Sequence, residues 1–205
     1  MDMKMKEEYI ATGIKEFDRI TGGGIPKEKV ILVEEEFSNV KSIFAQQVAV
    51  ELAKKNGKTM YVTQRSRKEI EEQMHIYGME FDESIDIETL NKLTESWDDY
   101  DMIIIENFSI SFSERKTKEI VDLIASLREM AATVLILSDM GILDKKQESV
   151  VRAMVDGVIQ FRFETEGVDR IRRSIVIPKF SHVVDEIIPF KVDGSGISID
   201  TRRRV

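Results

Sequence analysis

The chain contains no cysteine, and only two of its 205 residues are histidines. The first absence excludes disulfide bonds, thiolate zinc sites and cysteine nucleophiles, and the second argues against a multi-histidine metal site. No apolar run approaches the ~18 residues of a membrane-spanning helix, and the N-terminus, MDMKMKEE, lacks the apolar centre of a signal peptide. These absences predict a cytoplasmic protein without membrane contacts.

The composition is that of a folded, acidic protein. Hydrophobic residues make up 42% of the chain and charged residues 33%, which provides enough apolar material for a core. The formal net charge of -8 argues against a nucleic-acid partner, because an acidic surface repels phosphate. The length suits one domain, and no Pro/Gly/Ser-rich linker interrupts the sequence. We therefore expect a single domain over residues 1–205.

The first two thirds of the chain alternate between two patterns. Short, mainly apolar runs predict buried strands at 30–33, 60–63, 102–105 and 134–137, and amphipathic spacing predicts helices at 40–56, 66–77 and 113–130. Continuous apolar strands separated by amphipathic helices are typical of an α/β fold, whose mainly parallel sheet is covered by helices on both faces.

After Gly157 the apolar period becomes two. Further strands are predicted at 173–177, 186–191 and 197–199, and a helix at 145–154 joins this region to the parallel part. Alternation suits antiparallel strands, so we expect residues 157–205 to form an antiparallel C-terminal β extension of the same domain.

The strand at 30–33 and the helix that follows frame a candidate phosphate-binding loop. The pattern for such a loop is G-x-x-x-x-G-K-[ST]. Lys41 and Ser42 match its end, but Glu35 and Val40 occupy the two glycine positions. A valine tolerates positive φ poorly, and a glutamate places negative charge near the expected phosphates. On these residues alone, an ordinary helix N-terminus is the favoured interpretation.

Glu35 does not stand alone, because the run 34–36 consists of three glutamates. All three are expected beside the position of a triphosphate. The acidity of this loop therefore argues against nucleotide binding.

The flanking sequence resembles a known family. Residues 12–26, TGIKEFDRITGGGIP, closely resemble the "TGI..LD..L.GGGIP.G" segment that precedes the P-loop strand in the KaiC/RadA branch of the RecA-like ATPases. The resemblance continues through residues 44–63 and 155–159 and through a tail from Lys179 to Ile199. It implies a RecA-like P-loop NTPase fold over nearly the whole chain, with a mainly parallel central sheet flanked by helices and antiparallel strands at the C-terminal end.

The resemblance assigns roles to particular residues. It implies that Lys41 contacts phosphate, that Ser42 binds magnesium through its hydroxyl, and that Glu106 stands at the magnesium-side aspartate position. The acidic pair that activates water in the family is replaced here by Gln64 and Arg65, so no general base is expected.

The K-x-R motif near the C-terminus, which reaches a neighbouring subunit's nucleotide in the family, is also altered. Lys179 remains as a candidate subunit-interface contact, and Ser181 replaces the arginine. We therefore predict a pseudo-ATPase with no catalytic residue and no cofactor. ATP and magnesium would bind only if the site were still functional.

Three functions remain open. The favoured one is a regulatory or scaffolding subunit, of the kind used in signal transduction, that acts through a protein partner or in a homo- or hetero-oligomer. The alternatives are a retained ATP-binding protein, either a weak ATPase or a nucleotide switch, and a RadA-paralogue-like DNA-binding accessory protein. The last would use the arginines at 162, 170, 172, 173 and 202–204. We interpret Trp97 as a core residue and His182 as a structural or surface residue. Such proteins are common in archaea.

Overall fold

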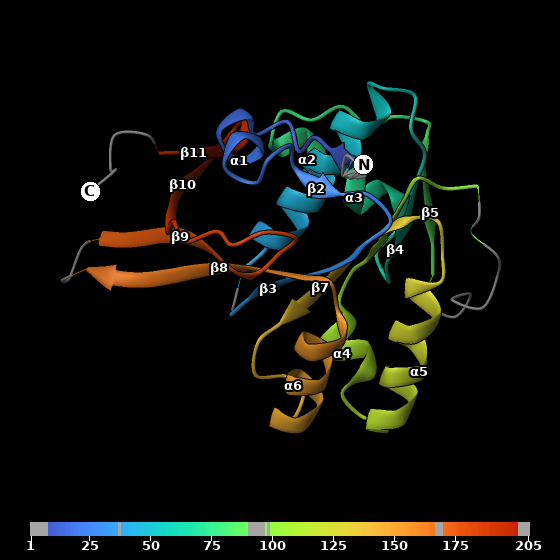
Figure 1. The fold of residues 1–205 in the computed structure, drawn as a ribbon. Coiled ribbons are helices and arrows are strands. Elements are labelled where there is room, and N and C mark those ends of the chain that lie inside the picture. Colours follow the sequence, from blue (N-terminus) through green and yellow to red (C-terminus); the bar gives the residue numbers. More distant parts are fainter. Residues whose placement is uncertain (1–7, 37, 90–96, 98, 167–169, 201–205) are drawn as a thin grey trace, which may run out of the picture.

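The computed structural model describes residues 8–36, 38–89, 97, 99–166 and 170–200. A nine-stranded sheet crosses the middle of the molecule, in the order β11-β10-β9-β8-β3-β7-β6-β4-β5 (Figure 1). Its strands are β3 (Val30–Glu35), β4 (Thr59–Val62), β5 (Ile85–Glu88), β6 (Met102–Ile105), β7 (Thr133–Asp139), β8 (Gly157–Glu166), β9 (Arg170–Lys179), β10 (Ile188–Asp193) and β11 (Gly196–Ile199).

Six neighbouring strands, from β8 to β5 in that order, run parallel, and β9 to β11 are antiparallel. This confirms the predicted α/β class and the antiparallel C-terminal end. One boundary differs, because β8 was expected in the antiparallel extension but pairs in parallel with β3. The helix between β7 and β8 explains this, since a helical crossover returns the chain to the end of the sheet from which it started.

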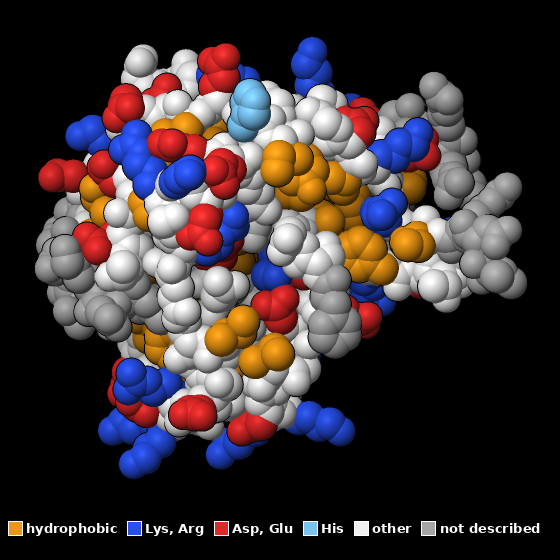
Figure 2. All heavy atoms as spheres, turned by 180° about the vertical axis from the view of Figure 1, so that it is seen from behind, with side chains coloured by type: hydrophobic (Ala, Val, Ile, Leu, Met, Phe, Trp, Pro, Cys, Tyr) orange, Lys and Arg blue, Asp and Glu red, His pale blue; other side chains and the backbone are white. Residues whose placement is uncertain are grey.

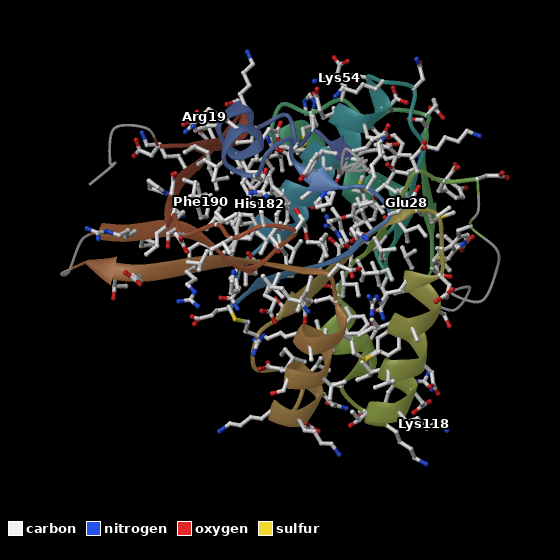
Figure 3. The ribbon with its side chains drawn as sticks, in the orientation of Figure 1. Arg19, Glu28, Lys54, Lys118, His182 and Phe190 are labelled. Carbon is white, nitrogen blue, oxygen red and sulfur yellow. The ribbon has the colours of Figure 1, made fainter. Side chains whose placement is uncertain are left out.

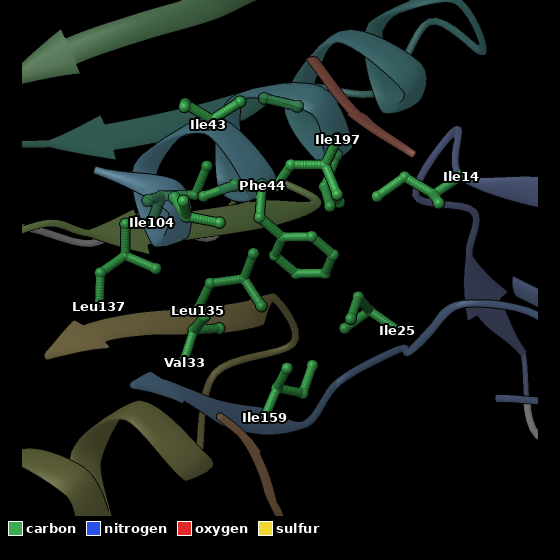
Figure 4. Close-up of a cluster of buried hydrophobic side chains, with 14 of the residues drawn as sticks. Ile14, Ile25, Val33, Ile43, Phe44, Ile104, Leu135, Leu137, Ile159 and Ile197 are labelled. Carbon is green, nitrogen blue, oxygen red and sulfur yellow. The ribbon is translucent and has the colours of Figure 1, made fainter. Parts of the chain in front are cut away.

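Helices cover both faces of the sheet. α1 (Lys15–Ile20), α2 (Val40–Ala53) and α3 (Arg67–Ile76) lie on one face, and α4 (Phe108–Phe112), α5 (Thr117–Arg128) and α6 (Lys145–Met154) lie on the other (Figure 1). Each face has its own apolar cluster. On the α2 face, Phe44 packs edge-to-face against Phe17 and Phe161. Figure 4 shows Phe44 among buried aliphatic side chains of this cluster, which include Ile25 and Leu135. On the other face, Trp97 is buried, as predicted.

Local sequence signals set several helix boundaries. A capping box made by Ser66 and Glu69 begins α3, and a second box, made by Asp144 and Gln147, begins α6. The helix predicted at 113–130 is shorter, because α4 and a turn occupy the segment before Thr117. Sequence patterning did not predict α1, α4, β5 or the short strands β1 (Tyr9–Ile10) and β2 (Ile25–Pro26).

Residues 12–26, which carry the family resemblance, form α1 and β2, and β2 pairs with β1. The carboxylate of Asp18 accepts hydrogen bonds from the backbone N–H and the hydroxyl of Thr12, at 3.0 and 2.6 Å. Gly24 has a φ of +112°, and a Cβ there would lie 2.2 Å from the carbonyl oxygen of Ile10. Only glycine fits that position, so the motif encodes the packing of this segment over the sheet.

None of the helices that the structure describes is long and apolar enough to cross a membrane.

Candidate functional site

The candidate site lies where β3 meets α2. The strand continues through Glu35, two residues further than the sequence pattern predicted. Successive side chains of a strand point to opposite faces of its sheet, so Glu34 and Glu35 separate. Glu34 lies under α6, where its carboxylate is 3.0 Å from Arg152 Nε and from Gln160 Nε2. The expectation that all of residues 34–36 surround one phosphate position is therefore wrong for Glu34.

Glu35 turns toward the N-terminus of α2. Its Oε2 accepts hydrogen bonds from the backbone N–H groups of Val40 and Lys41, at 3.1 and 3.2 Å, and its side chain is completely buried. In a P-loop, N–H groups at this position bind phosphate oxygens. Here a carboxylate of the chain accepts those bonds instead. Neither Glu35 nor Val40 has a positive φ, so the backbone has a conformation that non-glycine residues accept.

Lys41 points at the same carboxylate. Its Nζ lies 2.8 Å from Oε1 of Glu35, 2.7 Å from Oδ1 of Asp139 and 3.4 Å from the carbonyl oxygen of Ser38. Only 5% of the side chain is exposed. Burial by itself would lower the pKa of Lys41, but the two carboxylates outweigh burial and the pKa lies above its ordinary value. The charge of the lysine that the resemblance assigns to phosphate is thus balanced by two carboxylates of the chain itself.

Sequence reasoning missed Asp139. This residue ends β7, directly opposite Glu35 in the register of the two parallel strands. The available signal was its position, because polar residues at the carboxyl ends of parallel strands converge on one edge of the sheet. Its backbone N–H donates to Ser109 Oγ at 2.9 Å, which ties the strand end to α4.

Glu106, which the resemblance places on the magnesium side, is also hydrogen-bonded within the chain. Glu106 follows β6 and is buried. It accepts hydrogen bonds from the hydroxyls of Thr63 and Tyr61 at 2.5 and 3.0 Å, and Arg65 Nη1 lies 3.5 Å away. Burial, followed by the neighbouring Glu106, raises the pKa of Tyr61 well above its ordinary value. Tyr61 therefore remains a hydrogen-bond donor.

Gln64 and Arg65, which the resemblance places at the water-activating positions, follow the end of β4. Arg65 donates to Gln73 Oε1 at 2.6 Å and to the carbonyl oxygen of Glu69 at 3.0 Å. Gln64 is exposed, and its amide donates to Ser111 Oγ at 3.4 Å. Neither side chain has the chemistry of a general base at neutral pH.

The two remaining predicted contacts fall in different places. Ser42 is buried in the first turn of α2, beside Lys41. Lys179 lies at the end of β9 on the far side of β8 from this site, and its ammonium donates to the carbonyl oxygens of Arg152, Ala153 and Val155. This cation satisfies the C-terminus of α6. A contact of Lys179 with a neighbouring subunit stays a prediction.

His182 lies in the segment between β9 and β10, is exposed, and is labelled in Figure 3. Its ring centroid is 5.8 Å from that of Phe180, and its Nδ1 is 3.4 Å from Ser181 Oγ. These are structural contacts, in agreement with the interpretation from sequence.

As arranged, these side chains do not fit a bound nucleotide with magnesium. The phosphate position holds Glu35, the lysine is paired twice, and the carboxylate of Glu106 is already hydrogen-bonded. Within the described ranges, no group of three or more His, Asp or Glu residues could hold a metal ion. A cavity of about 360 Å³ lies at the other end of the parallel strands, where they begin, and is not part of this site. Its lining includes Gly57, Asp101 and Thr133, which precede or begin β4, β6 and β7.

Comparison with known proteins identifies similar folds and a family model that matches part of the chain. Residues 10–99 match the family model described as "ATPase: KaiC". The structure is similar to the KaiC-like protein PH0186 from the hyperthermophilic archaeon Pyrococcus horikoshii OT3, with a TM-score of 0.81 and 20% identity over 95% of this chain and 99% of that one. It is also similar to the flagellar accessory protein FlaH from Methanocaldococcus jannaschii, with a TM-score of 0.80 and 19% identity over 93% and 97% of the two chains.

A search of curated proteins gave no significant match. The fold likeness extends over nearly the full length of both solved structures, and the family match covers residues 10–99, which are less than half of the chain. The chain therefore has the fold of these KaiC-like structures over nearly its whole length, and its residues 10–99 are similar to the KaiC ATPase family.

Proposed function

We propose that this KaiC-like chain is a regulatory or scaffolding subunit that acts through protein contacts and does not hydrolyse ATP. The observation that carries the proposal is the Glu35 carboxylate, which accepts the N–H groups of Val40 and Lys41 that would otherwise face a phosphate. The chain thereby keeps the fold of its family while its own side chains close the nucleotide position.

The strength of these contacts supports the proposal. A phosphate could reach Lys41 only by displacing Glu35, which would leave a buried carboxylate without its partners. Breaking a buried ion pair costs about 3–5 kcal/mol, which lowers affinity by roughly two to four powers of ten. Asp139, 2.7 Å from the ammonium, would further repel the incoming anion.

Hydrolysis is opposed by a second set of contacts. At the end of β4, Gln64 and Arg65 supply no base, and the carboxylate of Glu106 is satisfied by the hydroxyls of Thr63 and Tyr61. A general base must reach the proton it removes and have a suitable pKa. No described side chain at this strand end combines the two.

Exposed apolar residues beside the site support a role in protein contacts. Ile110 on α4 is 53% exposed and Ile142, in the turn after β7, is 43% exposed. Both follow strands that end at the site, and Ile110 is next to Ser109, which binds the backbone of Asp139. We infer that a protein partner, or a homo- or hetero-oligomer, covers this edge.

The test is titration of the purified chain with ATP and magnesium by calorimetry, together with a phosphate-release assay. We expect no saturable heat at ATP concentrations far above the micromolar range and no turnover above background. Micromolar binding with turnover that Lys41→Ala abolishes would overturn the proposal.

A retained nucleotide switch is the second candidate. It is favoured by one observation, that Lys41 and Ser42 still occupy the first turn of α2. This candidate predicts that ATP raises the melting temperature and that Lys41→Ala removes the rise. No shift at millimolar ATP would eliminate it.

The DNA-binding candidate has less support. Arg162 donates to Gln160 on its own strand, and Arg172 stands opposite Glu164 across the β8–β9 ladder. Figure 2 shows acidic and basic side chains interspersed over one face rather than gathered into a basic area. The arginines at 202–204 lie outside the described residues.

A further inference from the structure

Three donors converge on one side chain at the start of α2. The N–H groups of Val40 and Lys41 reach one oxygen of Glu35, and the ammonium of Lys41 reaches the other. Every oxygen of this carboxylate is engaged, and none of its surface is exposed. Such complete satisfaction is what a buried carboxylate requires.

Removal of that carboxylate would leave a specific deficit. The N–H groups of Val40 and Lys41, at the positive end of a 14-residue helix, would lose the carboxylate acceptor, and Val40 would keep only Ser38 Oγ. Lys41 would lose one of its two carboxylates and keep Asp139, which is 17% exposed, and the longer contact with the carbonyl oxygen of Ser38. The space released would be bounded by these donors. Because Glu35 has no positive φ, a glycine there would remove the side chain without requiring a new backbone conformation.

One residue, Glu35, accounts for the poor fit between this site and the nucleotide phosphate that the family resemblance implies. We propose that the Glu35 carboxylate is a built-in replacement for a bound phosphate. The chain carries the anion that α2 and Lys41 require, so the β3–α2 connection is complete in the absence of any nucleotide. The inference rests on the proposed function, and it adds that the closed site stabilises the ligand-free fold.

The proposal predicts chemical rescue. We expect Glu35→Gly to lower the melting temperature and to lose amide-exchange protection at the start of α2. Inorganic pyrophosphate in the millimolar range should restore both, with a rise of at least about 3 °C in the melting temperature. The wild type should not respond to pyrophosphate beyond the effect of sodium chloride at equal ionic strength.

Two further variants identify the group responsible. Glu35→Gln keeps the shape of the side chain and an acceptor for the two N–H groups, so pyrophosphate should find no space and give no rise. Glu35→Gly combined with Lys41→Met should also fail to respond, because the ammonium is absent. Sodium sulfate offers a second oxyanion with which the rescue of Glu35→Gly can be repeated.

Circular dichroism at low temperature establishes that Glu35→Gly is folded, and equilibrium dialysis with labelled pyrophosphate then measures binding without a thermal transition. If Glu35→Gly unfolds, the same measurements use Glu35→Ala. A folded variant that neither binds pyrophosphate nor regains protection overturns the inference. So does a wild type that responds as strongly as the variant. ATP turnover by the wild type would instead overturn the proposed function, so the two failures are distinguishable.

Discussion

Glu35 and Asp139 are register partners on neighbouring parallel strands, and the ammonium of Lys41 lies within 2.8 Å of both carboxylates. The two carboxylates on adjacent strand ends would repel one another, and the Lys41 ammonium offsets this repulsion by pairing with both. The ends of β3 and β7 and the start of α2 are thereby held together.

Lys41→Met should destabilise the fold strongly. It leaves Glu35 buried beside Asp139 without a cation, and loss of one partner of a buried pair costs about 3–5 kcal/mol. The measurement is urea denaturation. Lys54→Met is the matched control, because Lys54 pairs with Glu51 on the same helix but is 65% exposed, and its loss should cost less than about 1 kcal/mol. Equal losses in the two variants would contradict the ionic account of the site.

Stability should fall at alkaline pH partly through Lys41. Its folded pKa lies above the ordinary value of 10.5, so the folded state retains the proton longer than the unfolded state. The stabilisation is therefore fully present below pH 10.5 and is lost as pH rises through the folded pKa. The measured quantity is the free energy of unfolding against pH for the wild type and Lys41→Met.

Tyr61 should also contribute to the fall in the free energy of unfolding at alkaline pH, so its contribution needs a separate control. Its folded pKa is raised well above 10.0, so above that pH only the unfolded state ionises and stability falls. Tyr61→Phe should flatten this part of the curve without removing the part that depends on Lys41. If Lys41→Met and the wild type keep a constant difference across the alkaline range, the titration assigned to Lys41 is wrong.

The Glu34–Arg152 contact should be a second stabilising ion pair, on the opposite face of β3. Glu34 is 4% exposed and Arg152 34%, and the bond to Glu34 raises the pKa of Arg152. Arg152→Met should therefore cost a few kcal/mol, about 2–4, measured by urea denaturation. The more exposed pair of Arg128 and Asp156 provides the comparison, and Arg128→Met should cost less. The reverse order would exclude this assignment.

Gly24→Ala should be among the most damaging glycine substitutions. The new Cβ would meet the carbonyl oxygen of Ile10 at 2.2 Å and would also require positive φ. Gly141→Ala serves as the control, since Gly141 has a φ of +83° but nothing within 4 Å of an added Cβ. The control should cost about 1–3 kcal/mol from backbone strain alone, and Gly24→Ala should cost more. Thermal melts of the two variants test the difference.

The sequence predicted most of the fold, because its strands and helices carry strong local patterns. The strand at residues 102–105 and the helix at 145–154 have the bounds that their apolar runs indicated. The parallel pairing of β8 was missed. Alternation of apolar and polar residues indicates a strand with one more buried and one more exposed face, but it does not determine whether the strand pairs in parallel or antiparallel. α4 was missed because five residues are too short for a periodic signal.

The site was predicted less completely. Lys41, Ser42 and Glu106 were located by the family pattern, but a linear motif cannot show which side chains face one another. Asp139 lies 98 positions from Lys41 and contacts it only because β7 is the neighbour of β3. The opposite orientations of Glu34 and Glu35 depended on the strand extending two residues further than its apolar run.

The ammonium of Lys179 connects strand β9 to the C-terminus of helix α6. It leaves β9 and ends on the last carbonyl groups of α6, the helix that precedes β8. Detachment of β9 would therefore expose the C-terminus of α6 as well as the edge of β8. Hydrogen exchange should find that β9 and the last turn of α6 open together, as one cooperative unit, although the chain reaches β9 only after completing β8.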